Sequence, residues 1–131
     1  PLMPRKRILA IDDEEAIREL FQQLLGKRGY EVLTAANGQE GLSLIEAERP
    51  DLVILDIATP EMDGYQFLKT MKDDRGMKDI PVIAISGVDT DIDRLKELGT
   101  DEFLSKPFSS TVLLETVQRL LRVSELKSSL E

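Results

Sequence analysis

Two kinds of segment alternate along this chain: short apolar runs and longer stretches in which apolar residues recur every three or four positions. The short runs are rich in Val, Ile and Leu and end at turn or polar residues, as strands buried on both faces do. We therefore predict strands at residues 7–11, 31–35, 52–55, 82–85 and 102–104.

The stretches between these runs have the spacing of amphipathic helices. The first helix is expected to stop at Gly29 as its C′ residue, and the second to begin at Asn37, which forms a capping box with Glu40 three residues later. Asp63 is the candidate N-cap of the third helix. The remaining helices are predicted over about 64–74, about 92–98, and from 109 or 110 to about 122.

Strict alternation of strands and helices with short connections predicts an α/β fold, in which helices cover both faces of a parallel sheet. At 131 residues the chain suits a single domain. We expect that domain to span residues 1–123, with residues 124–131 as a polar tail or the start of a linker.

The composition of the chain excludes several kinds of binding and catalysis. The chain has 17 Lys and Arg against 25 Asp and Glu, a net charge of −8, which argues against direct binding to nucleic acid or an anionic membrane. It has no His and no Cys, so histidine bases and thiol chemistry are excluded. No apolar run is long enough to span a membrane, residues 1–7 do not resemble a signal peptide, and we expect a cytoplasmic protein.

Polar residues follow four of the predicted strands. Asp12 and Asp13 follow the first, and Asp56, Ser86 and Lys106 follow the third, fourth and fifth. The carboxyl ends of parallel strands share one edge of a sheet, so these side chains should lie together, with the second strand outermost. Carboxylates ~4 Å apart repel by ~4 kcal/mol at an effective dielectric of 20. A divalent cation relieves that repulsion, and oxygen ligands suit Mg²⁺.

This set of residues favours phosphoryl chemistry. The cation and Lys106 would neutralise phosphoryl oxygens, and the Ser86 hydroxyl would donate to them. Asp56 would then be a carboxylate nucleophile that forms an acyl phosphate.

Four motifs, LAIDDEE, VILDIATPEMDG, VIAISG and FLSKPF, occur in this order between about residues 6 and 123. Together they resemble the receiver domain of two-component response regulators, the CheY-like group. The resemblance implies a flavodoxin-like sheet of strand order 2-1-3-4-5 flanked by five helices. It also implies Mg²⁺ as cofactor and a sensor histidine kinase or phosphotransfer protein as the phosphoryl donor.

The resemblance assigns roles to individual residues. Asp56 matches the phosphorylated aspartate, Asp13 a direct Mg²⁺ ligand and Asp12 a ligand acting largely through water. Asp56 itself and the main-chain carbonyl of Ala58 complete the implied metal site.

The resemblance also implies a switch. Ser86 and Lys106 match the switch hydroxyl and the phosphate-binding lysine, and Phe103 matches the aromatic that turns inward. The bond before Pro107 resembles the family's cis peptide. Phosphorylation would alter the surface of the fourth helix, fifth strand and fifth helix, and so control an unidentified effector or a homodimer. Because only 19 residues separate Ser86 from Lys106, fewer than is usual in the family, the fourth helix should be short or irregular.

Other interpretations remain open for this sequence. Taken singly, the acidic run after the first strand could cap a helix, and Ser86-Gly87 could be an ordinary turn. A phosphatase of the haloacid-dehalogenase type also uses an aspartate nucleophile, but it needs a second aspartate where Ala58 stands. A flavodoxin-like flavin module would need a phosphate-cradling first loop in place of the acidic one. A receiver that docks without being phosphorylated is a further alternative.

Positions Ala58 and Val88 lead to a prediction about lifetime. In the family these positions tune how water reaches the acyl phosphate, and neither side chain here can orient a water molecule. We therefore expect a phosphorylated state that decays over minutes or longer, measured as the phosphorylated fraction by mass spectrometry after the donor is removed. Decay within seconds would contradict this expectation.

Overall fold

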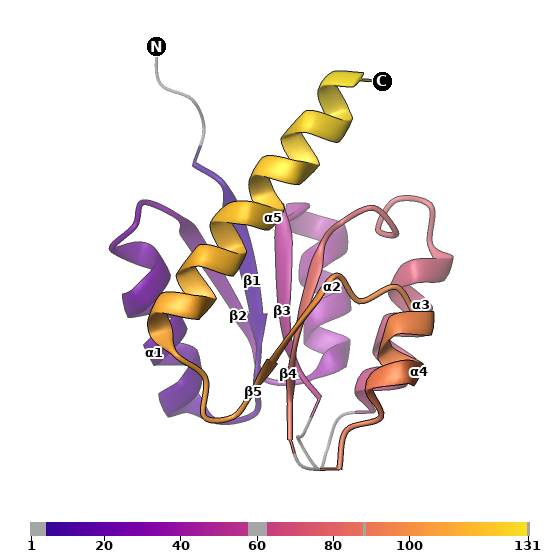
Figure 1. Ribbon diagram of the computed structural model, residues 1–131, viewed down its shortest axis with the longest axis horizontal. Helices are drawn as coiled ribbons and strands as arrows, with labels where there is room; N and C mark the ends of the chain where they lie inside the picture. The colour runs from indigo at the N-terminus through magenta and orange to yellow at the C-terminus, as the bar shows by residue number, and fades with distance from the viewer. Residues whose placement is uncertain (1–4, 58–62, 88, 131) are drawn as a thin grey trace.

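A five-stranded parallel sheet forms the centre of the computed structural model, which describes residues 5–57, 63–87 and 89–130 (Figure 1). The strands are β1 (Arg7–Ile11), β2 (Glu31–Ala35), β3 (Leu52–Asp56), β4 (Val82–Ser86) and β5 (Glu102–Ser105). Their order is β2-β1-β3-β4-β5 with every pairing parallel, so the predicted fold class and strand order are confirmed.

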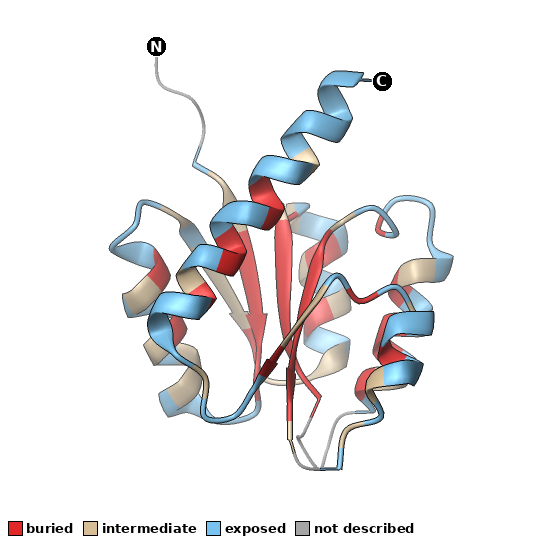
Figure 2. Ribbon diagram, in the orientation of Figure 1, coloured by how far each residue is buried: buried red, intermediate tan, exposed pale blue. Residues whose placement is uncertain are grey.

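Helices cover both faces of this sheet. They are α1 (Glu15–Gly26), α2 (Gly38–Glu48), α3 (Gly64–Asp73), α4 (Ile92–Glu97) and α5 (Ser110–Leu130). One core cluster joins the sheet to α1 and α5, and the other joins its opposite face to α2, α3 and α4. Figure 2 shows the central strands buried between these layers. Both β3 and β4 are buried throughout, as their continuous apolar runs predict.

The residues predicted to begin and end helices do so. The Asn37 side chain accepts a hydrogen bond from the Glu40 N–H at 2.9 Å, and the Glu40 carboxylate accepts one from the N–H of Ala36, just before the cap. Gly29 has φ +92°, the left-handed conformation of a C′ glycine. Tyr30 N–H donates back to the carbonyl of Leu25, which closes the helix end. Local chemistry therefore places these boundaries.

The two last helices differ in how well the sequence predicted them. As expected, α4 is short, with six residues. The predicted end of the last helix near Arg122 is wrong, because α5 continues to Leu130 and its last turns project beyond the sheet (Figure 1). Residues 123–130 contain no Gly or Pro to stop a helix, and Glu125 forms an ion pair with Lys6 at 3.2 Å. The domain boundary after residue 123 stays a prediction.

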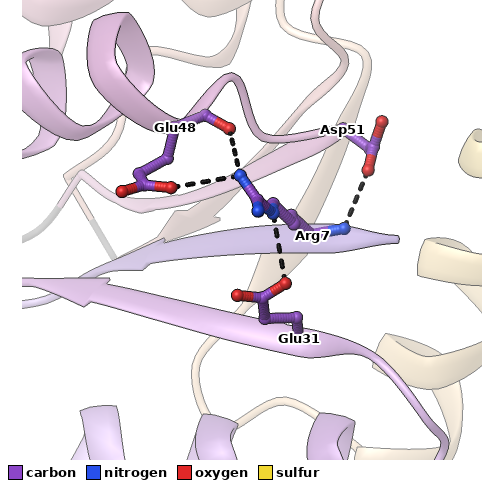
Figure 3. Close-up of polar contacts among 4 residues, drawn as sticks. All are labelled: Arg7, Glu31, Glu48 and Asp51. Atoms are coloured by element: carbon purple, nitrogen blue, oxygen red, sulfur yellow. Dashed lines mark hydrogen bonds and ion pairs between the residues drawn. The ribbon is translucent and has the colours of Figure 1, made fainter. Parts of the chain in front are cut away.

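Arg7 joins three segments at the amino-terminal edge of the sheet (Figure 3). Its Nε donates to Glu31 on β2 at 3.1 Å, and its Nη1 donates to the carbonyl and carboxylate of Glu48 at the end of α2 at 2.9 and 3.1 Å. Its backbone N–H donates to the Asp51 carboxylate at 2.8 Å, just before β3. The guanidinium and the backbone N–H of this one residue therefore hold β1 against its neighbours at the edge opposite the predicted site.

We expect Arg7→Ala to lower the free energy of unfolding by about 1 kcal/mol, because the ion pairs are half exposed but share one guanidinium that also binds a main-chain carbonyl. Urea denaturation measures the change. The matched control is Arg5→Ala, an exposed arginine two residues earlier, which should stay within about 0.5 kcal/mol of wild type. Equal losses in the two variants would contradict the role given to Arg7.

Candidate functional site

A buried carboxylate at the carboxyl end of β3 forms the centre of the site. Asp56 is the last residue of β3 and only 1% exposed. Lys106, which follows β5, places its Nζ 2.5 Å from Asp56 Oδ2. The structure therefore brings together two side chains that are 50 residues apart in the sequence. An ammonium at this distance offsets part of the free-energy cost of burying a charged carboxylate.

Asp12 is a second buried carboxylate beside Asp56. It is 1% exposed, and its Oδ1 accepts a hydrogen bond from the Glu14 N–H at 2.9 Å. Arg18 on α1 donates from Nη1 to the Asp12 carbonyl at 2.8 Å, which fixes the main chain where β1 meets the helix. Burial, the hydrogen bond with Asp56 and the negative charge of Asp56 together raise the pKa of Asp12 to about 7. The Glu14 N–H and Lys106 act in the opposite direction.

Lys106 responds to the same negative charge. Its burial by itself disfavours the ammonium, but the hydrogen bond and charge of Asp56 outweigh this, so that the pKa of Lys106 is raised. The charges of Asp12 and Glu14 add to the effect. Lys106 is therefore a firmly protonated cation at neutral pH.

Three acidic side chains converge beside this pair. One carboxylate oxygen from each of Asp12, Asp13 and Glu14 lies within 4.8 Å of the other two. Such all-oxygen donors, with like charges held this close, fit a hard divalent cation such as Mg²⁺. The predicted main-chain ligand at Ala58 lies outside the described residues.

Glu14 is a member of the cluster that sequence reasoning missed. In the sequence it belongs only to the acidic run after the first strand, which could cap a helix. It is the N-cap of α1, but its side chain makes no capping hydrogen bond and lies among the carboxylates instead. Only the main-chain turn after β1 shows this, so the residue order alone gave no signal.

The predicted switch residues lie on the two neighbouring strands. Ser86 ends β4, is 4% exposed, and its hydroxyl donates to the Leu104 carbonyl at 3.4 Å, a long hydrogen bond directed towards β5. Phe103 on β5 is half-buried against the core cluster of α2, α3 and α4. The Lys106–Pro107 peptide bond is cis. Val88, which we expect to affect the lifetime of the phosphorylated state, lies outside the described residues.

Comparison with known proteins identifies the family of this chain. The family model of the response regulator receiver domain matches residues 8–118. The chain therefore belongs to the response regulator receiver family, and its function is that of a receiver domain of two-component systems.

Named relatives of this chain include regulators of different lengths. It is 38% identical over 123 residues to the alkaline phosphatase synthesis transcriptional regulatory protein PhoP of Bacillus subtilis (strain 168), covering 92% of this chain and 50% of that protein. It is 36% identical to the polar-differentiation response regulator DivK of Brucella anthropi, covering 88% of this chain and 96% of DivK. The chain thus spans about half the length of the transcriptional regulators it matches, and nearly all of DivK.

A solved structure gives the same result for the fold. The chemotaxis protein CheY4 of Vibrio cholerae superimposes with a TM-score of 0.82 at 33% identity, covering 89% of this chain and 99% of that chain. These similarities favour the receiver over the phosphatase and flavin interpretations. Within the described part of the chain, no helix has the length and apolarity needed to cross a membrane.

The raised pKa of Asp12 predicts how stability depends on pH. Such a carboxyl group has a pKa of about 7 in the folded protein and near 4 in the unfolded chain, so the folded state binds its proton more tightly. The stability that this proton contributes is lost as pH rises to 7. The metal-free protein should therefore become less stable as pH rises from about 4 to about 7, a window in which Lys106, with its raised pKa, stays protonated.

We expect Asp12→Asn to remove most of this pH dependence and to stabilise the metal-free protein by about 2 kcal/mol or more at pH 7. Urea denaturation of both proteins in a chelator at pH 5 and pH 7 measures the difference. Asp93→Asn, at an exposed position of α4, is the control. An unchanged slope of stability with pH in Asp12→Asn would contradict the assignment.

Proposed function

We propose that Asp56 accepts a phosphoryl group from the phosphohistidine of a sensor kinase or a phosphotransfer protein, in a Mg²⁺-dependent reaction. The observation that carries this proposal is the contact of 2.5 Å between Lys106 Nζ and the buried Asp56 carboxylate, beside an acidic cluster that fits a divalent cation. Membership in the receiver family supports the same reaction.

The residues of the chain have separate tasks in this reaction. Asp56 Oδ attacks phosphorus, a P–O bond forms, the bond from phosphorus to the donor nitrogen breaks, and the electron pair leaves with the donor imidazole. Lys106 then moves its ammonium from the carboxylate oxygen to a phosphoryl oxygen, which it neutralises. Its raised pKa keeps it charged throughout.

The acidic residues would hold the cation. Asp12, Asp13, Asp56 and the carbonyl of Ala58 are the proposed ligand set, and Glu14 lies close enough to Asp12 and Asp13 to join it. Mg²⁺ supplies charge neutralisation for the carboxylates and for the incoming phosphoryl oxygens. Asp12, whose neutral form is favoured by burial, would give up its proton when the cation binds.

The response to phosphorylation would pass through β4 and β5. We propose that the Ser86 hydroxyl leaves the Leu104 carbonyl, to which it donates weakly, and donates to the phosphoryl group, and that Phe103 turns inward behind it. The surface of α4, β5 and α5 then favours an effector or a second copy. Arg119 and Glu102 form an ion pair on this surface at 2.6 Å. Sizing the protein with and without beryllofluoride, a phosphoryl mimic, tests the dimer.

We assign the domain no external substrate. It would catalyse only its own phosphorylation and the later hydrolysis of the acyl phosphate, and it would work in the cytoplasm, where a kinase can reach it. Its net charge of −8 favours contact with proteins over direct contact with nucleic acid or membrane.

Incubation with acetyl phosphate and Mg²⁺ should add about 80 daltons, the mass of a phosphoryl group, to the wild type and nothing to Asp56→Asn, because the amide is not a nucleophile. A chelator should suppress the addition. Intact-protein mass spectrometry measures it.

Asp73→Asn, at an exposed carboxylate at the end of α3, is the matched control and should react like wild type. If the wild type gains no mass under any of these conditions, or Asp56→Asn gains as much, the phosphoacceptor proposal is wrong and the chain is a docking receiver.

A further inference from the structure

Tyr65, in the first turn of α3, contacts the first turn of α4 in two ways. Its hydroxyl accepts a hydrogen bond from the backbone N–H of Asp91 at 2.9 Å. The guanidinium carbon of Arg94 lies 4.3 Å from the centre of its ring, within the range of a cation–π interaction. We refer to Tyr65, Asp91 and Arg94 as the α3–α4 clasp.

The clasp holds the point at which α4 begins. Asp91 is the N-cap of α4, and its Oδ1 accepts a hydrogen bond from the Arg94 N–H at 3.1 Å. A helix of six residues is unstable by itself, so its contacts with the rest of the protein decide whether it forms. Leu95 is the buried residue of α4, and the clasp adds a polar attachment at the start of the helix.

On its α3 side, the clasp comes shortly after Asp56 in the sequence. The side chain of Asp63 accepts a hydrogen bond from the Tyr65 N–H at 3.1 Å, so the same residue that caps α3 fixes the main chain of Tyr65. The tyrosine is half-buried, and its position is therefore tied to the start of α3.

On the other side, the clasp follows Ser86 by five residues. Between them, the Gly87 N–H donates a hydrogen bond to Thr90 Oγ1 at 2.9 Å. If Ser86 moved towards Asp56, the residues that follow it would have to adjust, and Tyr65 binds the N–H of Asp91 at their far end. The clasp therefore opposes that displacement as long as it is closed.

We propose that Tyr65 is a positioning residue that holds the segment after Ser86 in the arrangement of the unphosphorylated protein, and that the clasp opens when Asp56 is phosphorylated. This inference rests on the proposed function. One hydrogen bond and one exposed cation–π contact stabilise the closed state modestly, so loss of the hydroxyl should shift the equilibrium about three- to tenfold.

The composition of the chain offers a direct optical test. It has two tyrosines and no tryptophan, so Tyr30→Phe leaves Tyr65 as the only strongly fluorescent side chain. Tyr30 lies in the core cluster of α1 and α5, on the opposite face of the sheet from α3 and α4. Adding Mg²⁺ and beryllofluoride should change the emission of Tyr65 in this variant. Unchanged emission, while fluorine NMR shows bound beryllofluoride, would overturn the inference.

The second measurement is the affinity for beryllofluoride in the presence of Mg²⁺. Tyr65→Phe keeps the ring but removes the hydroxyl, and should bind beryllofluoride about three- to tenfold more tightly than wild type. Arg94→Gln, at an exposed position, should tighten binding about twofold and covers the case in which Tyr65→Phe does not fold. The controls Tyr30→Phe and Lys96→Gln should match wild type.

Each outcome has a distinct meaning. Equal or weaker binding by Tyr65→Phe and Arg94→Gln overturns the clasp but leaves the phosphoacceptor proposal intact, because wild type still binds the mimic. Absence of beryllofluoride binding in wild type contradicts the proposed function, and the inference about Tyr65 with it.

Discussion

Repulsion among buried carboxylates is the constraint around which this molecule is built. Asp12 and Asp56 are both about 1% exposed at the ends of adjacent strands, and Asp13 and Glu14 add negative charge beside them. A fold optimised only for stability would not place these groups together. Lys106 relieves part of the repulsion, and protonation of Asp12, whose pKa is raised, relieves another part. The remaining negative charge is what the proposed cation would neutralise.

The topology makes this arrangement possible. Because all five strands are parallel, their carboxyl ends meet at one edge of the sheet. The polar residues that end or follow β1, β3, β4 and β5 therefore come together there although they are far apart in the sequence. The opposite edge carries the Arg7 contacts, which bind β1 to its neighbours. The stabilising contacts of Arg7 and the mutually repelling carboxylates are therefore separated by the length of the strands. The charge at the carboxyl-terminal edge can change while the contacts at the amino-terminal edge hold the strands together.

The sequence predicted those features that local chemistry or a regular pattern determines. Strand positions followed from apolar runs, and the ends of helices followed from residues such as Asn37, Asp63 and Gly29. The meeting of Asp56 with Lys106 followed from the shared edge of a parallel sheet. What it did not predict depends on packing between distant segments. Beyond Arg122, α5 has no residue to stop it but is mostly exposed, and Glu125 there pairs with Lys6 before β1. The contact of Tyr65 with Arg94 depends on how α3 and α4 pack.

The length of α5 has a mechanical consequence. Its 21 residues form an uninterrupted helix about 31 Å long at 1.5 Å per residue, which begins four residues after Lys106 and whose other end stands clear of the sheet. Such a rod transmits rotation as well as position. Each residue turns the helix by about 100°. A partner that binds the outer end of α5 would therefore contact one particular face of it, and one inserted residue would rotate that face away from the partner.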